Sequence, residues 1–325
     1  MELNSNNIKP SFHVSDLLWD LWCVVSIIGI WPRFIEPNLV TTTKLSLPIS
    51  NLPEELKDLR ILQFSDLHLH PRVPDFFLTK LISKARKLKP DLIVFTGDFL
   101  CYSLLSEAER LKKFLNSFSA PYGCFAILGN HDYQQCVSVN EKGDYDVIRN
   151  DTSLIYKGFQ RLFSPLPLSK KVTPETQSIE HHQQLMHLLK ETPFKLLDNA
   201  TAVIPIHGTK LNLCGVGEHM LGHCKPEKAF QGYDKNYPGI ILAHNPDCVP
   251  QLQQYPGDVI LSGHTHGGQV NLPLMWRKFI LIKNIQFKRG LVKAGKKWVY
   301  VNRGIGSVFP FRWFSVPEIL LLTLE

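Results

Sequence analysis

Five short polar motifs constrain this chain most, because each follows an apolar run as long as a buried strand. They are SDLH at 65–68, GD at 97–98, GNHD at 129–132, AHNPD at 243–247 and SGHTHGGQ at 262–269. The preceding runs, such as RILQF at 60–64 and LIVFT at 92–96, have the composition of strands buried on both faces. Residues at strand ends of an open α/β sheet meet at one edge, where such folds place their sites. The motifs therefore predict one shared site.

The side chains in these motifs are carboxylates, imidazoles and an amide, all of which bind metal ions. Asp66 and His68 are two residues apart, so on an extended chain they point the same way. His264 and His266 repeat this spacing between glycines. A single Asp-x-His pattern usually consists of ordinary polar residues at the surface. The metal site is indicated by the occurrence of all five motifs in order. Oxygen and nitrogen ligands without thiolate suit manganese, iron or zinc.

Amphipathic segments separate the first predicted strands. Helical spacing at 76–89 and at 107–118 lies between strands at 60–64, 92–96 and 124–128. This alternation predicts βαβ units with right-handed crossovers. A further strand is expected within 38–53. After residue 199 the strand pattern resumes, with runs at 202–205, 210–216, 240–243, 258–261, 298–302 and 318–323.

The stretch from about 133 to 199 breaks the pattern, and we interpret it as an insertion over the main domain. It contains one predicted helix at 173–190 and no strong strand. Its heavy apolar content favours a lid, and the alternative is a solvated surface excursion. Its basic side chains either contact substrate phosphates or form a solvated charged face. These side chains are Lys157, Arg161, Lys170 and Lys171.

The N-terminal region holds an apolar segment, LLWDLWCVVSIIGIW at 17–31. It is short for a membrane span, which needs roughly 20 apolar residues. Its tryptophans are typical of a membrane interface, so we expect a membrane-surface anchor. A core helix and a marginal single span are the alternatives. Residues 1–37 are thus predicted to associate with a membrane, and 38–325 to form the enzyme domain with its inserted lid.

Composition narrows the choice of partners. The net charge of +7 favours phosphate-bearing or anionic-membrane partners. No basic block with interleaved aromatic residues occurs, so a nucleic-acid partner is not expected, and nothing indicates a protein partner. The seven cysteines are scattered and include no CxxC pair. This pattern does not indicate a disulfide framework, and it favours a reducing compartment.

Taken together, the five motifs resemble the conserved blocks of the calcineurin-like metallophosphoesterase superfamily, from Arg60 to the C-terminus apart from the insertion. The resemblance implies a four-layer α/β/β/α sandwich that hydrolyses phosphoesters at two divalent ions, for which we expect manganese. It assigns the first ion to Asp66, His68, Asp98 and His266. It assigns the second ion to Asp98, Asn130, His244 and His264.

The resemblance also implies how the site acts. Only Asp66 and Asp98 are anionic, so two divalent ions would leave a charge of about +2 for an anionic phosphate. A hydroxide would attack phosphorus in line. His131 would bind no metal, and would neutralise the phosphate or protonate the leaving oxygen as the catalytic group. Asp132 either orients His131 or has a surface role.

Segments outside the five motifs resemble the membrane-associated branch of the superfamily. These are FIEPN at 34–38 and YVNRGIG at 300–306, followed by Pro310, Arg312 and Pro317-Glu318, and the resemblance also includes HTHGGQ at 264–269. The resemblance extends to the chlamydial-type UDP-2,3-diacylglucosamine pyrophosphatases of lipid A synthesis, which release diacylglucosamine 1-phosphate and UMP. It implies a nucleotide-linked glycolipid substrate at the cytoplasmic face of a bacterial inner membrane. Arg303 would contact a phosphate or form a structural ion pair.

Two alternatives are a phosphodiesterase or phosphatase with soluble substrates, and a non-catalytic membrane scaffold. A scaffold would lack ligands, and none is missing here. The sequence departs from the family pattern after the strand at 210–216, where Glu218 stands in place of a common aspartate. His219 and His223 are expected at the surface.

Overall fold

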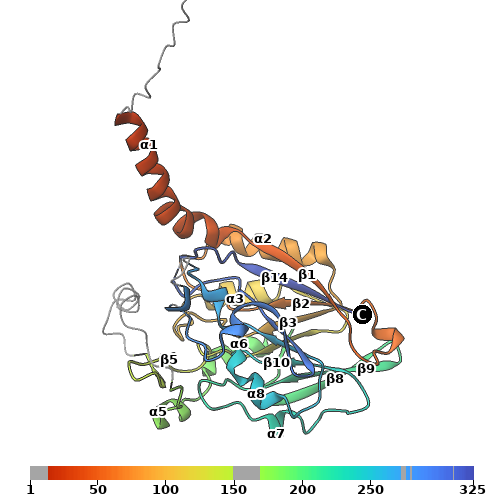
Figure 1. Ribbon diagram of the computed structural model, residues 1–325. Helices are drawn as coiled ribbons and strands as arrows, with labels where there is room; N and C mark the ends of the chain where they lie inside the picture. Colours follow the sequence, from red (N-terminus) through yellow and green to blue (C-terminus); the bar gives the residue numbers. More distant parts are fainter. Residues whose placement is uncertain (1–13, 149–168, 272–275, 279, 310) are drawn as a thin grey trace, which may run out of the picture.

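Two six-stranded sheets, packed face to face, form the centre of the protein. The computed structural model describes residues 14–148, 169–271, 276–278, 280–309 and 311–325 (Figure 1). The first sheet runs in the order β1 (Thr41–Leu47), β14 (Glu318–Leu324), β2 (Arg60–Phe64), β3 (Leu92–Thr96), β4 (Cys124–Ile127) and β7 (Phe194–Leu196). The second runs in the order β12 (Gly290–Ala294), β13 (Lys297–Val301), β11 (Val259–Ser262), β10 (Gly239–Leu242), β9 (Thr209–Gly215) and β8 (Ala200–Ile206).

Helices cover the outer face of each sheet. The first sheet is covered by α2 (Asp75–Leu88), α3 (Ala108–Leu115) and α6 (Gln183–Lys190). The second is covered by shorter elements, α7 (Pro226–Ala229), α8 (Val249–Leu252) and the 3-10 helix η7 (Ile285–Lys288). The remaining 3-10 helices are η2 (Glu36–Asn38), η3 (Glu54–Leu56), η4 (Pro246–Cys248), η5 (His266–Gly268) and η6 (Trp276–Lys278). Helix, sheet, sheet and helix make the predicted four-layer sandwich, which is confirmed.

Alternation along each strand builds three apolar cores. In β3, Leu92 and Val94 face the core between the sheets, while Ile93 and Phe95 face the helices. In β10, Ile240 faces the same inner core and Ile241 faces the outer helices. Neighbouring strands β2, β3, β4 and β7 are parallel, as are β9, β10, β11 and β13. The carboxyl ends of each parallel set therefore lie at one edge.

The segment predicted as an insertion divides into two parts. Its beginning forms a small hairpin of β5 (Val137–Val139) and β6 (Tyr145–Val147). Its end belongs to the sandwich, because β7 pairs with β4 and α6 packs with α3 on the first sheet. The single helix predicted at 173–190 is wrong: α5 (Pro174–Gln177) and α6 are separate helices. Any lid is thus shorter than 133–199.

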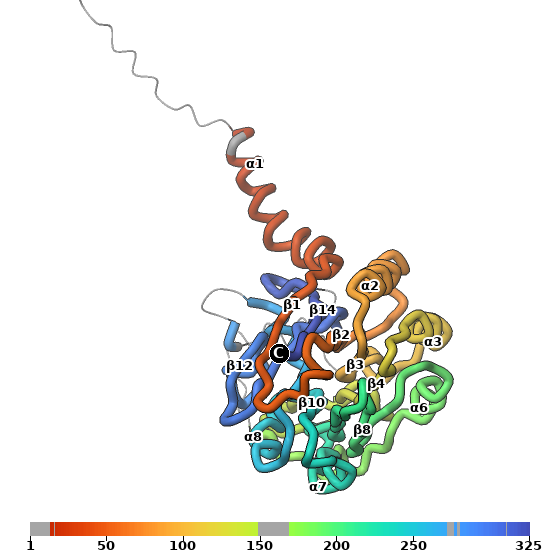
Figure 2. The backbone as a smooth tube through the Cα atoms, turned by 90° about the vertical axis from the view of Figure 1, so that its right-hand side faces the viewer, coloured from red at the N-terminus to blue at the C-terminus, as the bar shows by residue number. Residues whose placement is uncertain are grey.

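The N-terminal apolar segment is an exposed helix that projects from the domain (Figures 1 and 2). It comprises α1 (Val14–Val25), followed by the π-helical segment η1 (Ser26–Ile35). Trp19 is 67% exposed and Trp22 is 55% exposed, so the core-helix alternative is wrong. By length and composition, Leu17–Asn38 is long and apolar enough to cross a membrane, with a mean hydropathy of 1.4.

Glu36 fastens the foot of this helix to the domain. Its carboxylate is 1% exposed and accepts hydrogen bonds from the Trp31 indole at 2.9 Å and from the backbone N–H of Phe314 at 3.0 Å. It also accepts the N–H of Ser315. One residue from Trp31, the Pro32 carbonyl accepts the N–H of Arg312 at 2.8 Å. The helix foot is therefore held against the loop at 311–315.

Candidate metal centre

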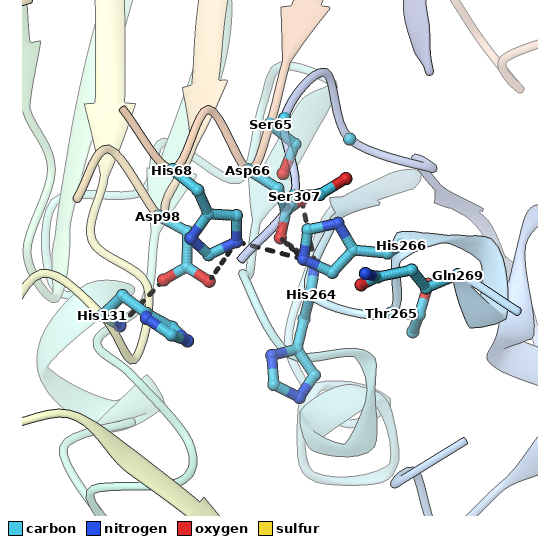
Figure 3. A network of polar contacts seen from close by, with 12 residues as sticks. Ser65, Asp66, His68, Asp98, His131, His264, Thr265, His266, Gln269 and Ser307 are labelled. Carbon is cyan, nitrogen blue, oxygen red and sulfur yellow. Dashed lines mark hydrogen bonds and ion pairs between the residues drawn. The ribbon is translucent and has the colours of Figure 1, made fainter. Parts of the chain in front are cut away.

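The predicted ligands of the first ion converge at the carboxyl end of β2. Nε2 of His68 lies 3.0 Å from Nε2 of His266 and 3.5 Å from Oδ2 of Asp98. Nε2 of His266 lies 3.6 Å from Oδ1 of Asp66. Figure 3 shows these side chains pointing toward one another from separate loops. All four are buried, with Asp66 and His68 fully so.

The predicted ligands of the second ion also meet at Asp98. Nε2 of His244 lies 3.2 Å from Oδ2 of Asp98. Nδ1 of His264 lies 3.0 Å from Oδ1 of Asn130, whose amide N–H donates to the carbonyl of Val137 at 2.8 Å. The hairpin strand β5 thus turns the Asn130 oxygen toward the site. All seven predicted ligands come together, and Asp98 lies between the two sets.

These residues fit divalent ions. Within the described residues, three groups place their ligand atoms within 4.8 Å of one another. The groups are Asp66–His68–His266, His68–Asp98–His131 and Asp98–His244–His264. Nδ1 of His68 donates to the carbonyl of Leu100 at 3.0 Å, and Nδ1 of His244 donates to that of Thr96 at 2.6 Å. When either ring is neutral, this hydrogen bond leaves its Nε2 lone pair free to bind an ion.

Ligand-bearing loops adopt a backbone conformation that L-residues rarely use. The φ angles of Asp66, His68, Asp98, His264 and His266 are 53°, 45°, 60°, 67° and 50°. Left-handed residues other than glycine cost free energy and are concentrated at functional sites. Backbone hydrogen bonds hold them, because the N–H of Asp66 donates to the carbonyl of Gly97 at 2.9 Å and the N–H of His68 to that of Asp98 at 3.0 Å.

Glycine is required where the loops touch. A Cβ atom on Gly263 would lie 1.9 Å from Oγ of Ser65 and 2.4 Å from Oδ2 of Asp66. A Cβ on Gly97, whose φ is +89°, would lie 2.8 Å from Nδ1 of His244. These glycines therefore let three ligand loops approach closely enough to share a site.

The surroundings of Asp66 and Asp98 shift the pKa values of their carboxyl groups in opposite directions. Burial raises the pKa of Asp66 to about 7. Burial also tends to raise the pKa of Asp98, but the neighbouring imidazoles, His244 first, outweigh it and hold that pKa well below its usual range. Asp98 is consequently the permanent negative charge in the middle of the cluster, as expected for a carboxylate shared by two cations.

His131 lies beside the cluster and is oriented by the backbone. Its Nδ1 accepts the N–H of Tyr102 at 3.0 Å, and its own backbone N–H donates to Oδ1 of Asp98 at 2.9 Å. A backbone N–H can only donate, so neutral His131 carries its ring proton on Nε2. The ring packs edge-on against His68, with centroids 4.7 Å apart. His131 can therefore offer a proton to an anionic group at the site.

Asp132 has neither of the roles considered for it. Its carboxylate is fully buried and accepts the backbone N–H groups of Asp98, Gly129 and Leu100 at 2.7, 3.0 and 3.0 Å. These hydrogen bonds do not involve the His131 ring; they join the loop after β3 to the loop after β4. Asp132 thus positions Asp98. Burial, reinforced by Asp98, raises its pKa to about 8.

Arg312 is a residue of the site that the sequence motifs did not identify. It is fully buried, and its Nη2 lies 3.2 Å from Nδ1 of His266. It also donates to the carbonyls of Arg303 and Ser315, each at 2.9 Å. Burial lowers its pKa to about 10, so it remains a cation at neutral pH. The resemblance to the membrane-associated branch included Arg312 but gave it no role in the site.

Arg303 forms a structural ion pair. Its guanidinium contacts the carboxylate of Glu318 at 2.7 Å and the hydroxyl of Thr41 at 3.0 Å. In the insertion, Lys170 is neither solvated nor directed at a substrate, because it forms a buried ion pair with Asp247. Lys171 is exposed. The other proposed phosphate contacts lie outside the described residues; they are Lys157 and Arg161.

Glu218 lies behind the second set of ligands. It is 1% exposed, accepts the N–H of Met220 at 2.9 Å, and has its pKa raised by burial to about 7. His219 and His223 are half-buried rather than at the surface. His219 packs edge-on against Tyr145 of the hairpin, with centroids 6.0 Å apart. These histidines support the insertion and are not among the converging ligands.

A family model described as calcineurin-like phosphoesterase matches residues 59–268. The chain belongs to the calcineurin-like phosphoesterases. This phosphoesterase is therefore a hydrolase, and its converging histidines and aspartates are those of a divalent-metal site. The match includes every converging ligand described above and stops short of Arg312.

Curated relatives extend the similarity beyond the family model. The phosphoesterase is 39% identical over 310 residues to the UDP-2,3-diacylglucosamine pyrophosphatase LpxG of Chlamydia muridarum, covering 90% of this chain and 92% of that protein. It is 40% identical over 308 residues to LpxG of Chlamydia trachomatis, with the same coverage. It is also 32% identical over 191 residues to the phosphodiesterase YaeI of Escherichia coli, covering 56% of this chain and 68% of that protein.

Proposed function

We propose that this hydrolase cleaves the diphosphate of UDP-2,3-diacylglucosamine, giving diacylglucosamine 1-phosphate and UMP in lipid A synthesis. The supporting observation is the identity of about 40% to two proteins of that name, which extends over 90% of the chain and so includes segments outside the family motifs. The exposed N-terminal helix agrees with a substrate that carries acyl chains.

The proposed centre holds two divalent ions, with manganese as the expected metal. One would be held by Asp66, His68, Asp98 and His266, the other by Asp98, Asn130, His244 and His264. When bound, the ions supply positive charge that clamps the phosphoryl oxygens and activates a water for attack. In its protonated form, His131 would neutralise charge on the phosphate or protonate the leaving oxygen. Asp132 and Arg312 keep Asp98 and His266 in place.

The function is tested by assaying UMP release from UDP-2,3-diacylglucosamine in mixed micelles with Mn²⁺, and again after addition of chelator. We expect release that disappears with chelator and returns with Mn²⁺. No release by folded, metal-loaded protein would overturn the proposed substrate. Equal efficiency on bis(p-nitrophenyl) phosphate would instead favour the phosphodiesterase alternative, for which the similarity to YaeI is the supporting observation.

We further propose that the helix at 14–35 attaches the enzyme to the cytoplasmic face of a bacterial inner membrane. Leu21 and Ile28 are 57% and 51% exposed on this helix. Replacing both with aspartate should lower the membrane partition coefficient at least about 100-fold, because each buried leucine or isoleucine contributes roughly 1.5–3 kcal/mol. Vesicle sedimentation measures this change. Leu291→Asp, on the edge strand β12 and 38% exposed, is the control expected to sediment normally.

A further inference from the structure

The foot of the N-terminal helix is joined to a predicted metal ligand through the 311–315 loop. On the side of the helix, three backbone N–H groups of this loop donate to residues 31–36. The N–H of Arg312 donates to the Pro32 carbonyl at 2.8 Å. The N–H of Phe314 donates to the Glu36 carboxylate at 3.0 Å, and the N–H of Ser315 donates to the same carboxylate. The position of this loop is therefore tied to the helix foot.

On its other side, the 311–315 loop contacts the segment that carries His266. The hydroxyl of Ser315 donates to the His266 carbonyl at 2.6 Å. A Cβ atom on Gly267 would lie 2.7 Å from that hydroxyl oxygen, so Ser315 occupies space that only a glycine leaves open. The N–H of Trp313 donates to the Gln269 carbonyl at 2.9 Å. The loop thus holds both ends of the segment 266–269, which Figure 3 shows beside the other ligands.

His266 needs this support because its backbone is strained. Its φ angle is 50°, in the left-handed region that residues other than glycine rarely adopt. Such a conformation persists only where the surrounding structure holds it. The Ser315 hydroxyl holds the carbonyl of His266, and Nη2 of Arg312 lies 3.2 Å from Nδ1 of its ring. Both contacts come from the 311–315 loop, so the position of this ligand depends on that loop.

Glu36 is the residue that fixes the loop to the helix foot. Its carboxylate is 1% exposed and accepts the N–H groups of Trp31, Phe314 and Ser315. Hydrogen bonds from N–H groups to a carboxylate are stronger than those between neutral groups. A buried N–H that loses its acceptor is unfavourable, so the loop should move when the carboxylate is removed. Ser315 would move with it, and Ser315 is the residue that holds the His266 carbonyl.

We propose that Glu36 is a positioning residue of the metal centre, which acts on His266 through Ser315. This inference rests on the proposed role of His266 as a ligand of the first ion. It adds that the helix foot, residues 31–36, has to be in place on the domain for that ion to bind. The proposed membrane anchor is then also a structural part of the metal centre.

The test is metal binding by Glu36→Ala and by Ser315→Ala in the full-length protein, without substrate. Both variants should bind the first ion at least about tenfold more weakly, because residues behind a metal ligand contribute about 10–100-fold to metal affinity. Titration with Mn²⁺ followed by electron paramagnetic resonance measures this change. The wild type should give the spectrum of two coupled ions, and the variants mainly that of a single ion. Ser315→Ala removes one hydroxyl and no buried charge, so it tests the same route even if Glu36→Ala does not fold.

Lys297→Met is the matched control. Lys297 is 5% exposed, and its amine also fastens a loop, because it donates to the carbonyls of Tyr255 and Gly257 at 2.7 and 2.6 Å. It lies at the start of β13, at the opposite end of the strand from the metal centre. This variant should lower the melting temperature and keep both ions.

The outcomes separate the positioning role from the proposed centre. Retention of both ions by either folded variant, or an equal loss of the first ion from Lys297→Met, would overturn the positioning role and leave the two-ion centre standing. A folded wild type that binds no pair of ions would overturn the two-ion centre, and the positioning role with it.

Discussion

Asp98→Ala removes turnover together with metal binding. Asp98 is the one carboxylate that lies between the two sets of ligands, 3.5 Å from Nε2 of His68 and 3.2 Å from Nε2 of His244. Removing a residue that only hydrogen-bonds to a metal ligand lowers metal affinity about 10–100-fold. Removing the shared carboxylate itself should therefore lower it more than about 100-fold. Metal content after gel filtration and UMP release measure the two effects.

Asp98→Asn separates charge from structure in this experiment. An asparagine oxygen can still accept the N–H of His131, which donates to Oδ1 of Asp98 at 2.9 Å. This variant should fold as the wild type does but should not bind the full complement of two ions. Asp91→Asn is the matched control, because Asp91 caps the opposite end of the same strand by accepting the N–H of Arg60 at 2.8 Å. Full metal content in Asp98→Asn would refute the bridging role.

His131→Gln keeps the metal ions and slows the reaction. His131 is predicted to act on the phosphate, so its removal should lower kcat by about 10²–10⁴-fold, as for other general acids. Metal content should stay at the wild-type value, which distinguishes a catalytic group from a ligand. Loss of an ion would instead show that His131 is a ligand. This outcome is worth measuring because His131 lies close to His68 and Asp98.

Cys136→Ala is the control for this variant. The Cys136 thiol lies 3.3 Å from Nδ1 of His131, so its removal disturbs the packing around the ring while leaving the ring itself. A rate within a few-fold of wild type would assign the loss in His131→Gln to the imidazole. A loss as large as that of His131→Gln would mean that packing, rather than proton transfer, accounts for both.

The sequence predicted the parts of the fold whose signal is local. Strands β2 and β3 were predicted with their observed limits, since each is a short, mainly apolar run that ends two residues before a predicted ligand. Strand β7 was not predicted, because its three residues are too few to show the apolar pattern of a strand. Its position is determined by pairing with β4. The break between α5 and α6 was missed because the residues between them, 178–182, include no glycine or proline that would mark the end of a helix.

The residues of the site divide in the same way, into those that local motifs predict and those whose roles depend on distant partners. The convergence of the seven proposed ligands was predicted because they occur in compact motifs that follow strands. No role was predicted for Arg312, and the role of Asp132 was misjudged, because both depend on partners distant in the sequence: Arg312 contacts His266, and Asp132 joins two loops through Asp98. Arg303 could be assigned to an ion pair only when β14 brought Glu318 beside it.

Glu36 has a consequence for how the enzyme would meet its substrate. A buried carboxylate that binds Trp31 and the 311–315 loop holds the proposed anchor in a fixed orientation on the domain. Attachment through that proposed anchor would confine the encounter with a lipid substrate to the membrane plane, and the fixed orientation would remove rotational searching. Turnover should then follow the mole fraction of lipid substrate in the surface, falling on dilution with inert lipid even when its bulk concentration is unchanged.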